Sequence, residues 1–214
     1  MTNLDHLMWK PDVFANEDFQ FHPWVTSANL GQEKIIDFMP PDGNFELLRY
    51  RITENVHIPF QIAPVIRAIS QNRIDILITV KSVFKPSRLS QKIKLQIPIP
   101  PHTKNVLLSC SKGMAKHKAD NNTITWKIKR MGGMKETQLR AKIELSDDNY
   151  SDMAWAELPV LMMNFELPFA LSGIKMIKLN VCEPNLKISN GDVIKWVRYM
   201  SIAGVYEIKY KTVS

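Results

Sequence analysis

The chain of 214 residues lacks the usual signatures of catalysis and cofactor binding. It has 8 glycines and no Gly-x-Gly-x-x-Gly or Walker sequence, which excludes the common phosphate-binding loops. Its two cysteines, Cys110 and Cys182, are far apart and form no Cys-x-x-Cys pair, which argues against a disulfide scaffold or a zinc knuckle. The five histidines are scattered. We therefore expect no metal site and no cofactor.

Catalytic constellations are also missing. Residues 109–112 match Ser-x-x-Lys, but the companion sequences of that enzyme class do not occur. No other set of residues supplies a nucleophile, a base and an oxyanion hole. The sequence thus favours a binding protein over an enzyme.

Long apolar runs and a secretion signal are lacking as well. No stretch approaches the roughly 18–20 apolar residues that span a bilayer. The first residues contain no basic region followed by an apolar one. We therefore expect a cytoplasmic protein.

Charge is present in an uneven pattern. Residues 61–145 hold 17 Lys and Arg against 4 Asp and Glu, a balance of +13. The rest of the chain holds 11 against 17, a balance of −6, which together give the net charge of +7. A basic middle part predicts a surface that faces a polyanion: a phosphoinositide membrane, a nucleic acid or an acidic protein. A solvated basic face without a partner is the alternative.

Hydrophobic side chains alternate with polar ones along much of the chain, which is typical of strands with one buried face. Dense Pro, Gly, Asn and Asp punctuation separates these segments. We predict an all-β, immunoglobulin-like β-sandwich without long helices. The clearest alternating segments are 74–81, 92–97, 124–129, 138–143 and 205–210.

Lysine and arginine fill the outward positions of three of these segments. The pairs are Lys92 and Lys94, Lys127 and Lys129, and Arg140 and Lys142. If the three strands are neighbours, their cations crowd one patch, and an anionic ligand would relieve the repulsion. Protection of the sheet against aggregation is the alternative role for such lysines.

Three blocks of sequence resemble the medium (mu) chains of clathrin adaptor complexes. Residues 35–51 read IIDFMPPDGNFELLRYR, residues 126–136 read WKIKRMGGMKE, and residues 193–199 read VIKWVRY. The likeness runs from about His22 to Tyr210 in the same order. Residues 84–87 and the lysine-rich run at 112–118 most resemble the chain of the endocytic, plasma-membrane adaptor.

The resemblance implies an elongated mu homology domain in which one subdomain is inserted in the other. The inserted basic subdomain would comprise residues 58–169, and the outer subdomain residues 22–57 and 170–214. Residues 1–21 are expected to be an irregular lead-in. The resemblance also implies that this chain begins after the longin-type domain, the linker and the opening strands of the outer subdomain. One of those strands carries the Asp of the family's tyrosine pocket.

Members of the family capture Tyr-x-x-Φ sorting signals, where Φ is a bulky apolar residue, by adding the peptide beside an edge strand. The matching strand here is 194–199. Trp196 would pack on the tyrosine ring, and Arg198 would stack on it and approach its hydroxyl. Lys195 and Val197 would lie on the opposite face of the strand. Met176, Leu179 and Val197 match positions that line the Φ pocket.

The resemblance further implies a phosphoinositide site at Lys112, Lys116, Lys118 and Lys127. Met114 stands where the endocytic chain has another lysine. The implied partners are the other adaptor subunits, cytosolic cargo tails and the phosphoinositide membrane, at the cytosolic face of clathrin-coated pits. One alternative is a stonin-like or muniscin-like scaffold that has lost tyrosine-signal binding. Nucleic-acid binding is not expected, because no aromatic side chains interleave the basic strands as base-stacking platforms.

Overall fold

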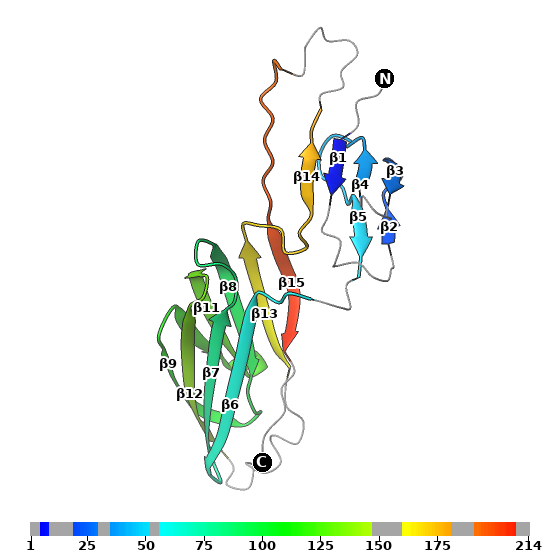
Figure 1. Ribbon diagram of the computed structural model, residues 1–214. Coiled ribbons are helices and arrows are strands. Elements are labelled where there is room, and N and C mark those ends of the chain that lie inside the picture. The colour runs from blue at the N-terminus through cyan, green and yellow to red at the C-terminus, as the bar shows by residue number, and fades with distance from the viewer. Residues whose placement is uncertain are drawn as a thin grey trace. The chain divides into compact units, whose positions relative to one another are not determined.

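The computed structural model describes residues 5–8, 19–29, 35–51, 56–146, 160–180 and 191–208. Its contacts divide the chain into two compact units (Figure 1). Unit 1 comprises Met1–His57 and Phe169–Tyr199, and unit 2 comprises Ile58–Pro168 and Met200–Ser214. Residues 200–214, which the sequence placed with the outer subdomain, thus group with the inserted part.

Unit 2 contains two antiparallel sheets. The register shifts at one point in each of the pairs β12–β9, β13–β15, β13–β8 and β6–β7. The first sheet has the order β10 (Met114–Lys118), β11 (Thr123–Gly132), β8 (Leu89–Pro98), β13 (Leu161–Leu167) and β15 (Ser201–Ile208). The second has the order β6 (Phe60–Ser70), β7 (Arg73–Ser82), β12 (Glu136–Leu145) and β9 (Thr103–Cys110). A single 3-10 turn, η2 (Ala119–Asn121), joins β10 to β11.

The inner faces of these two sheets form the core of unit 2. On β7 and β12 every second side chain is buried, and the charged positions between them face outward. The same alternation buries Trp126 and Ile128 on β11. The ring of Phe60 on β6 contacts that of Phe165 on β13, with centroids 5.0 Å apart. The predicted all-β sandwich is therefore confirmed, because period-two burial on both sheets leaves each with one apolar face to cover.

Unit 1 is built from shorter strands. One sheet has the order β14 (Lys175–Lys178), β1 (Asp5–Met8), β4 (Ile35–Phe38) and β3 (Val25–Asn29), and β2 (Phe19–Phe21) pairs with β5 (Leu48–Tyr50). Among the described residues its fully buried hydrophobic side chains are Ile36 and Phe38, both on β4. Phe45, Leu47 and Met176 pack against them.

Residues 1–21 differ from the expected irregular lead-in, because β1 and β2 lie within them. β1 is flanked on both sides, by β4 and by β14. A strand of four residues that pairs on both sides is held by its backbone hydrogen bonds rather than by side-chain alternation. This explains why the sequence pattern gave no sign of it.

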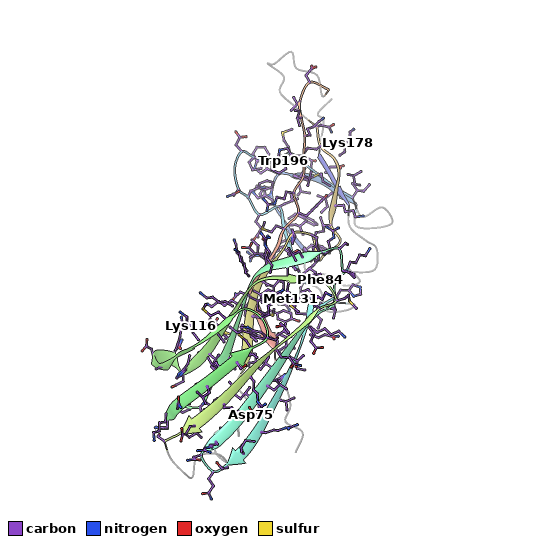
Figure 2. The ribbon with its side chains drawn as sticks, turned by 90° about the vertical axis from the view of Figure 1, so that its left-hand side faces the viewer. Asp75, Phe84, Lys116, Met131, Lys178 and Trp196 are labelled. Carbon is purple, nitrogen blue, oxygen red and sulfur yellow. The ribbon has the colours of Figure 1, made fainter. Side chains whose placement is uncertain are left out.

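A polar cluster fastens the turn at 132–135 to β7 and β8. The hydroxyl of buried Ser82 donates to the carbonyl of Gly132 at 2.7 Å, and that of buried Ser90 donates to the carbonyl of Met131 at 2.8 Å. The amide of Lys135 in turn donates to the Ser82 hydroxyl at 3.0 Å. These bonds occupy backbone groups that would otherwise be buried without partners. Figure 2 labels Phe84 and Met131 in this part of unit 2.

The described part of the chain contains no helix long and apolar enough to span a membrane. Within the same residues, no group of three or more His, Cys, Asp or Glu side chains is placed to hold a metal ion.

Candidate functional site

The predicted phosphoinositide lysines lie on and beside the β10–β11 hairpin of unit 2. Lys116 and Lys118 alternate with the half-buried Ala115 and His117, so they face outward from β10. Lys127 faces outward from β11, where it is opposite Met114. Lys112 lies in the turn before β10, and its carbonyl accepts a hydrogen bond from the indole of Trp126 at 2.8 Å. The structure therefore brings three of the four lysines to one face of the five-stranded sheet, with the fourth beside it.

A hollow of about 580 Å³ lies on the same face. Its lining includes Lys94 and Lys127, which are opposite each other on β8 and β11, together with Lys92, Met114 and Lys129. Lys92 pairs with Glu166 at 2.8 Å, which offsets its charge. Within the described ranges Lys94, Lys127 and Lys129 form no ion pair, and their cations favour an anionic ligand here.

The centre of this face holds a buried hydroxyl. Thr125 is 4% exposed and lies between Lys116 on β10 and Gln96 on β8. Among the described residues, its Oγ1 has no hydrogen-bond partner. A buried hydroxyl without a partner is costly. No sequence pattern points to this hydroxyl, because a threonine at an outward strand position is ordinary.

The predicted basic face is smaller than the sequence suggested. Lys92, Lys94, Lys127 and Lys129 are on neighbouring strands, but Arg140 and Lys142 are on β12 of the other sheet. Arg140 is also paired there with Asp75 on β7. This pairing lowers the pKa of the Asp75 carboxyl below its ordinary value, chiefly through the hydrogen bond from the guanidinium. Alternation tells which side of a strand a residue faces, but not which strands pair, so this part of the prediction was wrong.

The predicted peptide segment, 194–199, lies in unit 1 and is exposed. Trp196 is 76% exposed, and Lys195 and Arg198 are also exposed. The structure assigns no strand to 194–200, in contrast to the predicted strand. Figure 2 shows Trp196 in the same unit as Lys178 at the end of β14. Trp196 is therefore not a core tryptophan, which was the alternative to a binding role.

Tyr199 connects this segment to β14. Its hydroxyl accepts a hydrogen bond from the amide of Met176 at 2.8 Å. This bond fastens the segment to β14, the strand that pairs with β1. Sequence reasoning did not assign a role to Tyr199, and its only signal was its place directly after the Trp196–Arg198 pair.

The three predicted Φ-pocket residues have different surroundings. Met176 packs against Ile36 and Phe38 on the core side of unit 1. Leu179 is half-buried just after β14, and Val197 is 44% exposed. The structure thus places Met176 in the core and Val197 at the surface.

The sequence profile of the adaptor complexes medium subunit family matches residues 6–210. The chain belongs to this family. The expectation drawn from the three sequence blocks is confirmed.

Three curated relatives of this medium-subunit chain are each named AP-2 complex subunit mu. The protein of Caenorhabditis elegans is 50% identical over 196 residues, that of Dictyostelium discoideum 35% over 192, and that of Saccharomyces cerevisiae 33% over 198. The matches cover 89–91% of this chain but only 40–44% of the relatives. The medium-subunit chain therefore spans less than half the length of these proteins.

Solved structures share the fold of the medium-subunit chain. The Fcho1 mu homology domain of Danio rerio, solved with a bound Eps15 peptide, has a TM-score of 0.66 at 15% identity. The match covers 95% of this chain and 78% of the Fcho1 chain. The yeast delta-COP-I mu homology domain, complexed with a Dsl1 WxWxV peptide, has a TM-score of 0.53 at 18% identity, covering 81% and 72%. At these identities the likeness establishes the fold, which is that of mu homology domains.

Proposed function

We propose that this chain is the cargo-selecting module of a clathrin adaptor medium chain of the endocytic type. It binds Tyr-x-x-Φ signals in the cytosolic tails of membrane cargo and attaches to phosphoinositide membrane. It acts together with the other adaptor subunits at the cytosolic face of coated pits. Membership of the medium subunit family and the AP-2 mu relatives support this role.

The exposed Trp196 is the observation that carries the cargo proposal. A tryptophan that is 76% exposed leaves a large flat apolar surface in water, which is unfavourable unless a partner covers it. Its neighbour Arg198 supplies a guanidinium that stacks on aromatic rings. An extended peptide that adds beside this segment would gain main-chain hydrogen bonds as well as the contact with the indole ring. The same features favour cargo binding over a scaffold that has lost it.

The lysine face supports membrane attachment. Lys112, Lys116, Lys118 and Lys127 are all exposed. A lysine near an anionic membrane surface contributes about 1 kcal/mol, so four would contribute about 4 kcal/mol at low salt. Such a term is weak enough for reversible recruitment, and simultaneous cargo binding would add avidity.

A peptide titration of the 214-residue chain tests the cargo proposal. A labelled peptide with a Tyr-x-x-Leu core should bind, and the same peptide with Ala in place of Tyr should not. Trp196→Ala should weaken binding at least about tenfold, because the tyrosine ring loses its packing surface. Trp24→Ala is the matched control, since Trp24 is another exposed tryptophan of unit 1, at 47%. Equal binding of the Tyr and Ala peptides, or equal losses in the two variants, would contradict the proposed site.

A further inference from the structure

A second hollow lies on the outer face of the four-stranded sheet of unit 2, on a different sheet from the lysine face. Its volume is about 450 Å³. Figure 2 shows Asp75 on the strands that form it. The lining includes Ile69, Asp75, Leu107, Arg140 and Lys142. Neither the proposed peptide segment nor the phosphoinositide lysines take part in it.

Cations outnumber carboxylates in this hollow. The guanidinium of Arg140 donates from Nε to both carboxylate oxygens of Asp75, at 3.0 and 3.1 Å. Arg67 on β6 and Lys142 on β12 lie directly opposite the same Asp75 in the strand register. Arg140 holds the pKa of Asp75 below its ordinary value, so this carboxylate is ionised at neutral pH and neutralises one cation. The lining itself has three cations, Arg73, Arg140 and Lys142, against the two carboxylates of Asp75 and Glu144, an excess of one. Arg67, which lies opposite Asp75 on the edge strand β6, brings the excess to two.

Apolar side chains flank this charged centre. Ile69 on β6 is 63% exposed, and Leu107 on β9 is 62% exposed. β6 and β9 are the two edge strands of the sheet, so the two side chains stand on opposite sides of the hollow. An exposed aliphatic surface around a few fixed charges is the usual composition of a recognition site.

The spacing sets the length of a ligand. Three inter-strand steps of about 4.8 Å separate β6 from β9, or roughly 14 Å. Leu107 is in line across the sheet with Arg67, and Ile69 lies two residues further along β6, so a ligand that covers both crosses the sheet obliquely. An extended peptide rises about 3.3 Å per residue, so side chains four residues apart span roughly 13 Å and point to the same side. The residue midway between them faces the sheet as well.

We propose that this hollow binds an extended segment of a partner protein with the pattern Φ-x-acidic-x-Φ. The two apolar side chains cover Ile69 and Leu107. The acidic side chain lies over the two inner strands, where Lys142 balances it, and Arg67 on the edge strand adds to the positive field. An anionic bilayer is a poorer occupant, because its many charges would meet Asp75 and Glu144 as well as the cations, whereas a single acidic side chain can lie beside Lys142. A nucleic acid fits less well too, because no aromatic side chain lines the hollow to stack on a base.

The test uses the 214-residue chain and a panel of fluorescein-labelled nonapeptides on a Gly-Ser background. Leu, Ile, Met or Phe occupies the third and seventh positions, and Asp or Glu the fifth. Fluorescence anisotropy should detect binding for members of the panel, and Asn or Gln at the fifth position should abolish it. Arg67→Gln combined with Lys142→Gln should weaken binding at least about tenfold. Leu107→Ser should weaken it several-fold, and it tests the site without risk to the core because Leu107 is exposed.

Matched controls separate this site from the others. Lys94→Gln combined with Lys129→Gln removes the same charge from the other sheet and should leave the affinity unchanged. Trp196→Ala should also leave it unchanged, which distinguishes this site from the proposed cargo site. The proposal is overturned if no panel member binds, if the control pair weakens binding as much as the test pair, or if Leu107→Ser has no effect. Loss of phosphatidylserine vesicle binding in the Arg67 and Lys142 double variant, with peptide binding retained, would make the face a membrane surface instead.

Discussion

At the scale of single residues, Thr125 and Thr137 offer a matched comparison. Both are buried, at 4% and 3% exposure. The Thr137 hydroxyl lies 2.9 Å from that of Ser111, whereas Oγ1 of Thr125 has no partner. Valine has nearly the same shape as threonine without the hydroxyl, so the two replacements isolate the contribution of each hydroxyl group.

We expect Thr125→Val to raise the free energy of unfolding by about 1 kcal/mol, because a desolvated hydroxyl without a bond is removed. Thr137→Val should lower it by about 1 kcal/mol, because a buried hydrogen bond is lost. Urea denaturation of the chain measures both. Destabilisation by Thr125→Val of the same size as by Thr137→Val would mean that the Thr125 hydroxyl does have a partner, such as a bound water.

At the scale of elements, the turn at 132–135 depends on close backbone packing. A Cβ atom added to Gly133 would lie 2.1 Å from the carbonyl oxygen of Lys85 and 2.4 Å from that of Phe84. Backbone atoms cannot move aside as the end of a flexible side chain can. The turn between β11 and β12 therefore tolerates no side chain at this position.

Gly133→Ala should lower the free energy of unfolding by about 1–3 kcal/mol, the usual cost of overpacking. Gly204→Ala on β15 is the control, because its Cβ would meet nothing within 4 Å. That change should be neutral or stabilising by about 0.5 kcal/mol, since alanine has fewer conformations to lose on folding. Chemical denaturation distinguishes them, and similar stabilities of the two variants would show that the loop at 84–85 can shift.

Most of the strands in unit 2 could be predicted from the sequence, whereas those of unit 1 could not. The alternation around Ile76, Leu95, Trp126 and Ala141 marks β7, β8, β11 and β12, because each has one face in the core. β1 has no such pattern, since its place depends on pairing with two distant strands. The exposed segment at 194–199 alternates like a strand, but the structure assigns no strand to it.

For the candidate site, too, part could be predicted from the sequence and part could not. Resemblance named Trp196 and the lysines of the β10–β11 hairpin, and the structure places these side chains at the surface. The contacts of these side chains could not be predicted from the sequence. Met176 packs against the core of unit 1, and the hydroxyl of Tyr199 accepts a hydrogen bond from the Met176 amide. Such contacts depend on which segments of unit 1 fold together.

At the scale of the whole molecule, the charges that make up the net charge of +7 are distributed unevenly. We expect the location of the lysines, rather than the net charge alone, to decide membrane binding. Vesicles that contain phosphatidylinositol bisphosphate should bind the chain, and binding should weaken as salt rises. Changing Lys116, Lys118 and Lys127 to Glu should abolish cosedimentation with these vesicles. The reason is that this change reverses three charges on one face of the five-stranded sheet.

A control with the same change in net charge tests whether position matters. Lys81, Lys85 and Lys104 are exposed residues of unit 2 outside the five-stranded sheet, and their change to Glu should weaken cosedimentation only slightly. Circular dichroism should show both triple variants to be folded. Equal losses in the two would mean that overall charge, rather than the face around Lys116, attracts the membrane.

The pairing of β13 with β15 closes residues 169–199 into a loop. Leu167 and Ser201 are opposite each other in the register, so the chain leaves unit 2 and returns to it at neighbouring points. The loop carries both β14 and the segment around Trp196. Because the ends of the loop are fixed, β14 and the segment around Trp196 lose less entropy when they come together. The closed loop also keeps the two segments near each other, so the effective concentration of one around the other is high. A substitution at Asn164 on β13, whose side chain donates to the carbonyls of Ala203 and Gly204, would therefore weaken the proposed peptide binding by loosening the closure, without touching the peptide.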